Sequence, residues 1–274
     1  MLTIVIPMAG RGSRFAEAGY ELPKPLLPIH GIPMIEAVVR NLAPSEPARF
    51  VFICQREHLA SFGFEAGLRK AAPGCEIVAI DGVTEGAACT VLLAEHAIDP
   101  GDVLVIANSD QWVDHTMDAH LDVMRRDDLD GLIMTMTADD PKWSFVALDD
   151  RNLVTTVVEK VVISDEATVG IYAFARGGEF IRAAKAMIAA DERVNGEFYV
   201  APVYNQLIAE GARIGIDNVG SEGDGMYGLG IPADYEGFLK LALSLRAAGL
   251  DRSRKTPTGS RLADATTSAR GAGA

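Results

Sequence analysis

Several features that mark other protein classes are absent from this chain of 274 residues. No apolar run approaches the roughly 20 residues that a membrane-spanning helix needs. The first apolar stretch is short and leads directly into glycine and arginine, which is not the pattern of a signal peptide. The three cysteines, Cys54, Cys75 and Cys89, are isolated and lack metal-ligand spacing. We therefore expect a cytoplasmic protein, without a membrane partner, whose cysteines are small core or near-core residues.

Positive charge is also in short supply. The 25 lysines and arginines are outnumbered by 38 acidic residues, the formal net charge is −13, and no basic block occurs. This balance disfavours nucleic acid and anionic membranes as general partners. It leaves a phosphorylated small molecule open as a ligand, because the charge close to a site decides such binding. The apolar share of 49% indicates a folded chain with a sizeable buried core.

Two common nucleotide-binding motifs are missing as well. The dinucleotide pattern G-x-G-x-x-G needs a small residue where this chain has Phe15, and no acidic residue closes a second strand at the expected distance. The Walker pattern G-x-x-x-x-G-K-[ST] does not occur.

What is present is an apolar strand pattern at residues 3–7 that breaks into a glycine loop. Gly10 and Gly12 allow the backbone to turn tightly and to bring its N–H groups close to a polyanion. Arg11, Arg14 and Lys24 can add fixed positive charge at the same place. The segment therefore predicts a phosphate-binding loop, and a nucleoside triphosphate is the expected ligand.

The motif Gly10-Arg11-Gly12-Ser13-Arg14, followed by Pro23-Lys24-Pro25-Leu26, resembles the signature of the sugar-phosphate nucleotidyltransferases, G-x-G-[ST]-R and P-K-[PA]-L. The resemblance implies an enzyme that joins a nucleoside triphosphate to a phosphorylated small-molecule acceptor, with Mg²⁺, and releases pyrophosphate. The stretch Asn195-Gly196-Glu197-Phe198-Tyr199 is similar to that of a subgroup acting on capsule and surface-polysaccharide precursors.

Strand and helix patterns alternate along the chain, which predicts an α/β protein with a mixed, mainly parallel sheet flanked by helices. The resemblance specifies a Rossmann-like fold of the nucleotide-diphospho-sugar transferase type. We expect one domain over residues 1–250 and a disordered tail over 251–274. Strands are expected at 3–7, 49–54, 76–80, 103–107, 131–137, 145–148, 154–159, 168–175 and 213–219. Of these, 103–107 is expected to be central in the sheet, and 145–148 and 154–159 to form a hairpin. Helices are expected at 34–42, 58–71, 87–96, 117–126, 178–190, 198–210 and 233–248.

Ligands of such sheets bind at the carboxyl ends of the strands. Asp110 follows the expected strand at 103–107, and its carboxylate suits Mg²⁺, which takes one or two protein carboxylates together with phosphates and waters. A turn-forming aspartate explains the residue equally well, and the resemblance favours the metal role. The predicted nucleotide-binding residues are Met8, Ala9, Gly10, Arg11, Gly12, Ser13, Glu85, Gly86, Ala87 and Asn108.

The resemblance implies further roles. Glu85-Gly86-Ala87 corresponds to the family's nucleobase turn, although an acidic residue at a helix N-terminus explains it too. Many members have a second metal-binding aspartate where this chain has Gly228. Either one carboxylate suffices here, or Asp224 or another acid replaces the missing one, and a surface-turn role suits Asp224 better. The implied acceptor-binding residues are Gln111, Glu159, Lys160, Gly170, Glu197 and Tyr199, of which Tyr199 equally fits a core position.

The implied mechanism needs no general base, because an acceptor phosphate is already a nucleophile. Arg14 and the loop amides would hold the β,γ-phosphates, Lys24 the α-phosphate, Lys160 the acceptor phosphate and Asp110 the Mg²⁺. Arg14, Lys24 and Asp110 are therefore the candidate catalytic residues.

Two other functions stay open. A glycosyltransferase that uses a nucleotide sugar would normally have a D-x-D motif, which Ser109-Asp110-Gln111 lacks. A catalytically silent nucleotide- or sugar-sensing module would not need to keep the metal site. The nucleobase, the acceptor (a sugar 1-phosphate or a non-sugar phosphomonoester) and the oligomeric state are not readable, so a homo-oligomer is allowed.

Overall fold

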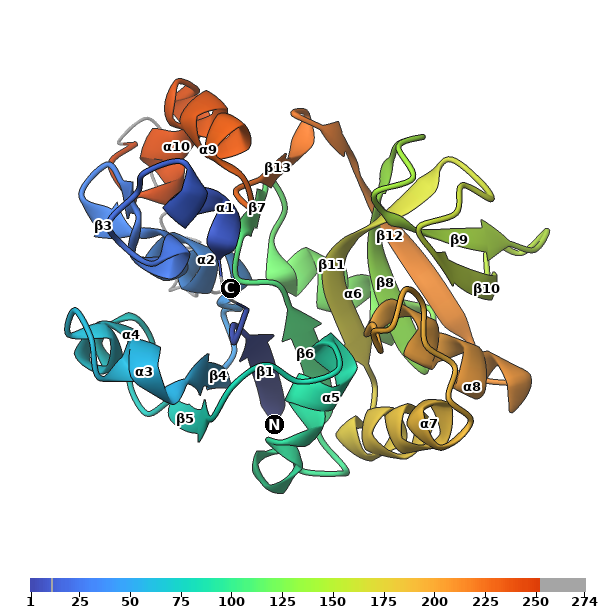
Figure 1. Ribbon diagram of the computed structural model, residues 1–274. Coiled ribbons are helices and arrows are strands. Elements are labelled where there is room, and N and C mark those ends of the chain that lie inside the picture. Colours follow the sequence, from blue (N-terminus) through green and yellow to red (C-terminus); the bar gives the residue numbers. More distant parts are fainter. Residues whose placement is uncertain (11, 252–274) are drawn as a thin grey trace, which may run out of the picture.

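The computed structural model describes residues 1–10 and 12–251. At its centre lies an 11-stranded sheet (Figure 1). Nine of its strands follow the order β5-β4-β1-β6-β11-β8-β12-β13-β7, and the other two, β9 and β10, form a hairpin that joins the sheet through β11. Its strands are β1 (Leu2–Pro7), β4 (Ala48–Gln55), β5 (Glu76–Ile80), β6 (Val103–Ala107), β7 (Gln111–Val113), β8 (Gly131–Thr137), β9 (Ser144–Leu148), β10 (Val154–Glu159), β11 (Glu166–Phe174), β12 (Ile214–Glu222) and β13 (Gly225–Gly228). A separate small hairpin pairs β2 (Pro28–Ile29) with β3 (Ile32–Pro33).

Helices cover both faces of the sheet. They are α1 (Ser13–Glu17), α2 (Met34–Leu42), α3 (Arg56–Leu59), α4 (Phe64–Ala71), α5 (Ala87–Leu92), α6 (Met117–Arg126), α7 (Gly177–Ala189), α8 (Tyr204–Ala209), α9 (Pro232–Leu239) and α10 (Ala242–Ala247), with 3₁₀ turns at Lys24–Leu26, Glu95–Ala97 and Ala201–Val203. Among the described residues, no helix has the length and apolar character needed to span a membrane.

The sheet has a parallel part and a mixed part. Strands β5, β4, β1 and β6 pair in parallel, whereas β11 runs antiparallel to both β6 and β8. Strand β6 thus lies between the two parts, which confirms the central place expected for residues 103–107. The carboxyl ends of β1 and β6, where the glycine loop and Asp110 begin, consequently lie side by side.

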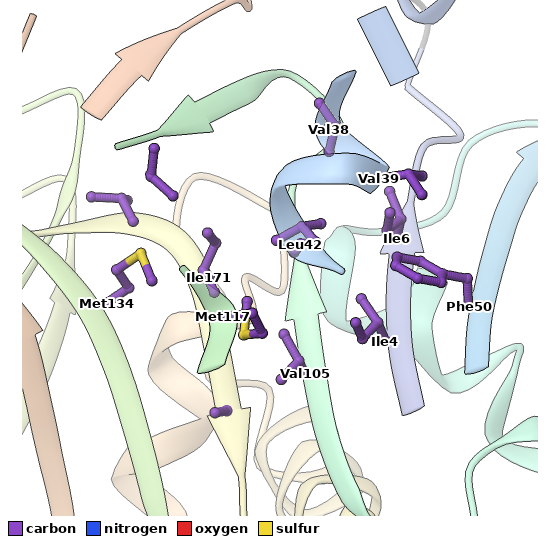
Figure 2. Close-up of a cluster of buried hydrophobic side chains, with 14 of the residues drawn as sticks. Ile4, Ile6, Val38, Val39, Leu42, Phe50, Val105, Met117, Met134 and Ile171 are labelled. Atoms are coloured by element: carbon purple, nitrogen blue, oxygen red, sulfur yellow. The ribbon is translucent and has the colours of Figure 1, made fainter. Parts of the chain in front are cut away.

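Alternation along the strands divides the core between the two faces. Ile4 and Ile6 of β1 lie on one face and pack with Val38 and other residues of α2, as Figure 2 shows, whereas Val5 belongs to the cluster on the opposite face. All of these are buried, and complete burial of one such side chain stabilises the folded state by about 1.5–3 kcal/mol. The covering helices are α2, α4 and α6 on the first face and α5, α7 and α8 on the second.

A third cluster joins the two ends of the described chain. Phe15 on α1 lies edge-on to Tyr20 and to Tyr235 of α9, with ring centroids 5.2 and 6.0 Å apart. The Tyr235 hydroxyl donates to the carbonyl of Pro28 at 2.6 Å. In Figure 1, α9 and α10 accordingly lie beside α1 and β3. The last helices therefore brace the segment that carries the glycine loop.

Most of the expected elements are present, and the fold class is confirmed. The helices expected at 34–42 and 117–126 and the strands at 76–80, 103–107, 131–137 and 154–159 have the observed bounds. Three expected helices are wrong in extent. The expected helix at 58–71 is divided into α3 and α4, and the one at 233–248 is divided into α9 and α10. The expected helix at 87–96 ends early, and a 3₁₀ turn follows α5. The first break follows from two successive residues with positive φ, Phe62 (58°) and Gly63 (65°).

The expected helix at 198–210 is wrong for a different reason. Its first residues do not form a helical turn, because the backbone of Phe198 is hydrogen-bonded to the turn at residues 85–88, and α8 begins only at Tyr204. Strands β7 and β13, too short for a periodic pattern, were not predicted. Cys54 and Cys75 are buried as expected, and burial raises the pKa of the Cys54 thiol to about 12. Apart from Asp251, the expected tail lies outside the described residues, and the single domain stays a prediction.

Candidate active site

The glycine loop starts from a firmly held backbone. The amide of Met8 donates to the carbonyl of Ile53 at 2.9 Å, and the buried Gln55 amide donates from Nε2 to the carbonyl of Ala9 at 2.5 Å. Gly12 then adopts a left-handed conformation (φ 61°) directly before α1. The carboxyl end of β4 therefore holds the loop that follows β1, and a residue with a side chain would be strained at position 12.

Lys24 and Asp110 meet in a cavity of about 470 Å³ beside this loop. Lys24 Nζ lies 2.6 Å from Asp110 Oδ2, and both side chains are largely shielded, with exposed fractions of 19% and 26%. Gly10 and Gly12 also line this cavity, which we call the loop cavity. The structure thus brings the predicted lysine and the predicted metal ligand together.

Asp110 has room on its far side because of a glycine. The carbonyl of Asp110 accepts from the amide of Leu229 at 2.8 Å, and a Cβ on Gly230 would lie only 2.9 Å from Asp110 Oδ2. Position 228 carries no carboxylate of its own, and a Cβ there would lie 3.5 Å from Asp234 Oδ2. Asp224 closes an exposed turn with Ser221, whose amide donates to the Asp224 carbonyl at 2.7 Å.

The donor set around Asp110 suits a metal that is shared with a substrate. The described residues contain no group of three or more His, Cys, Asp or Glu side chains that could hold a metal by themselves. Mg²⁺ is commonly bound through one or two carboxylates together with substrate phosphates. Asp110 therefore fits Mg²⁺ that is also bound by a triphosphate. Without a triphosphate, a metal ion would have to compete with the Lys24 ammonium for the Asp110 carboxylate.

Arg14, Ser13 and Arg11 are less clearly placed. Arg14 and Ser13 are exposed in the first turn of α1, and neither is a lining residue of the loop cavity. The Arg14 guanidinium has no hydrogen-bond or ion-pair partner in the part of the chain that the structure describes, so its charge is available to a ligand. Arg11 lies outside the described residues.

The predicted nucleobase turn is joined to a segment far away in the sequence. The amide of Phe198 donates to the carbonyl of Glu85 at 2.8 Å, and the amide of Ala88 donates to the carbonyl of Phe198 at 3.0 Å. Gly86 lies between them with a φ of 133°, and a Cβ there would be 2.4 Å from the Phe198 carbonyl oxygen. The exposed Glu85 carboxylate pairs with Arg193 at 3.3 Å. Only glycine fits at position 86.

A second cavity, of about 320 Å³, contains most of the predicted acceptor residues, and we call it the acceptor cavity. Glu159 is 6% exposed, accepts a hydrogen bond from the Ser144 hydroxyl, and has a raised pKa because burial disfavours its charged form. Lys160 Nζ donates to the Tyr199 hydroxyl at 2.5 Å. The cavity is also lined by Ala87, Asn108, Lys142, Trp143, Thr168, Gly170 and Tyr172.

Asn108 lines both cavities, so they adjoin at the carboxyl end of β6. Its amide donates to the Gly170 carbonyl at 3.0 Å, and a Cβ on Gly170 would lie 2.1 Å from Asn108 Nδ2. Gln111 is buried behind Gly170, and its Nε2 has no partner among the described residues. Glu197 is exposed in a tight turn with Val194 and does not line the acceptor cavity.

Sequence reasoning missed several lining residues. Trp143 contributes an indole Nε1 that is buried without a partner among the described residues, and Ser144 contributes the hydroxyl bound to Glu159. His58 lines the loop cavity from α3. These residues carry no motif, and the only available signal was their position beside a strand end.

The fold and the two adjoining cavities define an α/β protein whose candidate site lies at the carboxyl ends of its central strands. The family model described as Nucleotidyl transferase matches residues 4–201, and the chain belongs to this family. This confirms the resemblance drawn from the N-terminal motifs.

Among solved structures, the chain is similar to a nucleoside-diphosphate-sugar pyrophosphorylase from Vibrio cholerae, with 29% identity, a TM-score of 0.74, and coverage of 87% of this chain and 100% of that one. It is also similar to a UDP-glucose pyrophosphorylase, with a TM-score of 0.66 and coverage of 86% and 96%, although 16% identity shows the fold alone.

Bifunctional protein GlmU of Thermotoga maritima is 28% identical over 214 residues, which are 75% of this chain and 44% of that protein. A second relative, from Novosphingobium aromaticivorans, is 28% identical over 220 residues, with coverage of 77% and 46%. The chain thus spans less than half the length of these two relatives.

Proposed function

We propose that this protein is a pyrophosphorylase-type nucleotidyltransferase that couples a nucleoside triphosphate to a sugar 1-phosphate or a related phosphomonoester, with Mg²⁺. One observation supports this most directly. Asn108 joins a cavity holding a lysine–aspartate pair to a second cavity holding Glu159 and Lys160. Two phosphorylated ligands bound in adjoining cavities can bring their phosphates together, which is what nucleotidyl transfer requires.

In the loop cavity, the chain would bind the triphosphate and neutralise its charge. Lys24 would contact the α-phosphate, and Arg14 and the amides of the loop from Met8 to Ser13 would contact the β,γ-phosphates. Asp110 would hold Mg²⁺, which supplies positive charge to the phosphate oxygens. The nucleobase would lie against the Glu85–Ala87 turn. Because Glu85 pairs with Arg193, the backbone at Gly86 is the more available partner for the base.

In the acceptor cavity, Lys160 would bind the acceptor phosphate, and the buried Glu159 would accept hydrogen bonds from acceptor hydroxyls. Gly170 makes room for the Asn108 side chain at the wall, and Gln111 has an unpaired amide behind it. Tyr199 lines the cavity beside Lys160, and Glu197, on the exposed turn before it, would contact the acceptor from outside the cavity. The phosphate oxygen attacks the α-phosphorus, and the bond to the β-phosphate breaks, so that pyrophosphate leaves. Charge neutralisation and positioning account for the rate enhancement without a general base.

The proposed function also implies a cellular location and a use for the product. The expected triphosphate is an intracellular metabolite, so a cytoplasmic location goes with this function. An activated sugar or related group is a precursor for polymer assembly, which agrees with the resemblance to the polysaccharide-precursor subgroup.

Pyrophosphate release tests the proposal. The purified protein is incubated with Mg²⁺, each nucleoside triphosphate in turn, and a panel of sugar 1-phosphates and non-sugar phosphomonoesters. We expect release with one pairing, and product analysis then identifies both substrates. Turnover of finished nucleotide sugars instead would indicate a glycosyltransferase, and triphosphate binding without any turnover would indicate a sensor.

A further inference from the structure

Lys160 has an unusual backbone for its residue type. Its φ is 58°, in the left-handed region that residues with a side chain rarely adopt, at a cost on the order of 1–2 kcal/mol. Its amide donates to the carbonyl of Trp143 at 3.0 Å, which holds this conformation against β9. The Lys160 side chain lines the acceptor cavity directly after the end of β10.

The end of this side chain is held by one residue. Lys160 Nζ lies 2.5 Å from the Tyr199 hydroxyl oxygen and 4.6 Å from the centre of its ring. In the described part of the chain, no carboxylate oxygen lies within ion-pair distance of this ammonium, whereas Lys142 in the same cavity is paired with Glu222 at 3.0 Å. The charge of Lys160 is therefore oriented but not neutralised.

Tyr199 owes its place to the turn at residues 85–88. It directly follows Phe198, whose amide and carbonyl are both hydrogen-bonded to that turn. Gly86 permits this approach, since a Cβ there would overlap the Phe198 backbone. The Arg193 guanidinium, 4.5 Å from the Phe198 ring, is also paired with Glu85. The contact between Tyr199 and Lys160 is therefore anchored on the candidate nucleobase turn.

From these contacts we infer that Tyr199 is a positioning residue that acts through Lys160, holding its ammonium in place for the anionic group of the acceptor. This inference rests on the proposed function. In this arrangement the Tyr199 oxygen accepts a hydrogen bond from the Lys160 ammonium. The hydroxyl thereby restricts the flexible lysine to one geometry, which lowers the entropy lost when the acceptor binds.

The charges around Lys160 give the inference a measurable signature. The Tyr199 hydrogen bond raises the pKa of Lys160, burial opposes it, and the carboxylates of Glu159 and Glu197 also raise it. Tyr199→Phe keeps the ring and both carboxylates and removes only the hydroxyl. The pKa of Lys160 should therefore fall, and its ammonium should lose charge at a lower pH than in the wild type.

Two measurements test the inference. Competitive acetylation across pH, read residue by residue by mass spectrometry, should show Lys160 of the Tyr199→Phe variant reacting faster and with its midpoint at lower pH. With the substrates identified by the release assay, the variant should raise the acceptor KM about tenfold, with kcat and the triphosphate KM changed much less. Tyr235→Phe is the matched control. It also removes a tyrosine hydroxyl, the one that donates to the Pro28 carbonyl, and Tyr235 belongs to the third core cluster.

An unchanged Lys160 labelling midpoint in Tyr199→Phe would overturn the inference, whether or not the protein turns over any tested pair of substrates. A lowered midpoint with an unchanged acceptor KM would also overturn it, since the contact would then exist without serving the acceptor. Absence of turnover in the wild type counts against the proposed function alone, because the labelling result is independent of activity.

Discussion

The loop cavity and the acceptor cavity adjoin at Asn108, yet they are assembled in different ways. The loop cavity takes most of its lining from the first 25 residues, with additions from His58, Phe62 and the turn after β6. The acceptor cavity takes its lining from short pieces near residues 87, 108, 143, 160, 170 and 200. A site made from one continuous segment leaves a motif in the sequence, and a site made from many segments does not.

The two cavities also treat charge differently. The loop cavity places its lysine on a carboxylate, so that Lys24 and Asp110 neutralise each other before any ligand binds. The acceptor cavity places its lysine on a neutral phenol and raises the pKa of its buried glutamate. The first arrangement suits a ligand that brings both negative charge and a metal, and the second suits an anion bearing hydroxyls.

The largest expected effect comes from the carboxylate of the loop cavity. Asp110→Asn should lower kcat/KM on the order of 10³-fold, because the amide holds a metal poorly and leaves Lys24 without its partner. Asp224→Asn, in an exposed turn, is the matched control and should turn over normally. Equal activities for the two variants would remove Asp110 from the proposed site.

The contact between the turn at residues 85–88 and Phe198 is tested by Gly86→Ala. A Cβ at position 86 would lie 2.4 Å from the Phe198 carbonyl oxygen, so we expect a loss of about 2–4 kcal/mol in the free energy of unfolding. Urea denaturation measures this change. Gly82→Ala is the control, since Gly82 also has a positive φ (81°) but nothing within 4 Å of its Cβ position. If both variants lose the same amount, the backbone conformation matters and the contact with Phe198 does not.

The glutamate of the acceptor cavity should make acceptor binding sensitive to acid. Burial raises the pKa of Glu159, so as the pH falls it takes up a proton earlier than an ordinary glutamate. The wild-type acceptor KM should therefore rise at mildly acidic pH. Glu159→Gln should raise this KM about tenfold and abolish its acid dependence, as measured by initial rates across pH. An acid limb that persists in the glutamine variant would assign it to another group.

The smallest expected effect concerns metal binding by the free protein. Lys24→Met removes the ammonium that pairs with Asp110. Mn²⁺, used as a spectroscopic substitute for Mg²⁺, should therefore bind to this variant several-fold more tightly than to the wild type. Titration followed by electron paramagnetic resonance measures the affinity. Lys185→Met breaks an ion pair of the same 2.6 Å length with the half-exposed Glu95 and should leave the affinity unchanged. Identical Mn²⁺ affinities for wild type and Lys24→Met would show that the pair does not compete with the metal.

Local chemistry accounts for what could be predicted. The β-branched run before Gly10, the glycine and proline positions around Lys24, and the apolar spacing from Met34 to Leu42 act over a few residues, and they led to the strand, the loop motif and the helix. The family and the fold class are confirmed on this basis. The roles of the individual site residues stay predictions.

The amino-acid sequence by itself determined the loop after β1, the alternation that divides the core between two faces of a sheet, and the placing of Asp110 at a strand end. Only the tertiary structure decided that Phe198 pairs with the turn at Gly86, that Tyr199 meets Lys160, and that Gly170 makes room for Asn108. The physical reason is the range of the interactions. Periodicity and turn preferences depend on neighbours in the chain, whereas these contacts depend on backbones that approach each other only after the sheet has formed.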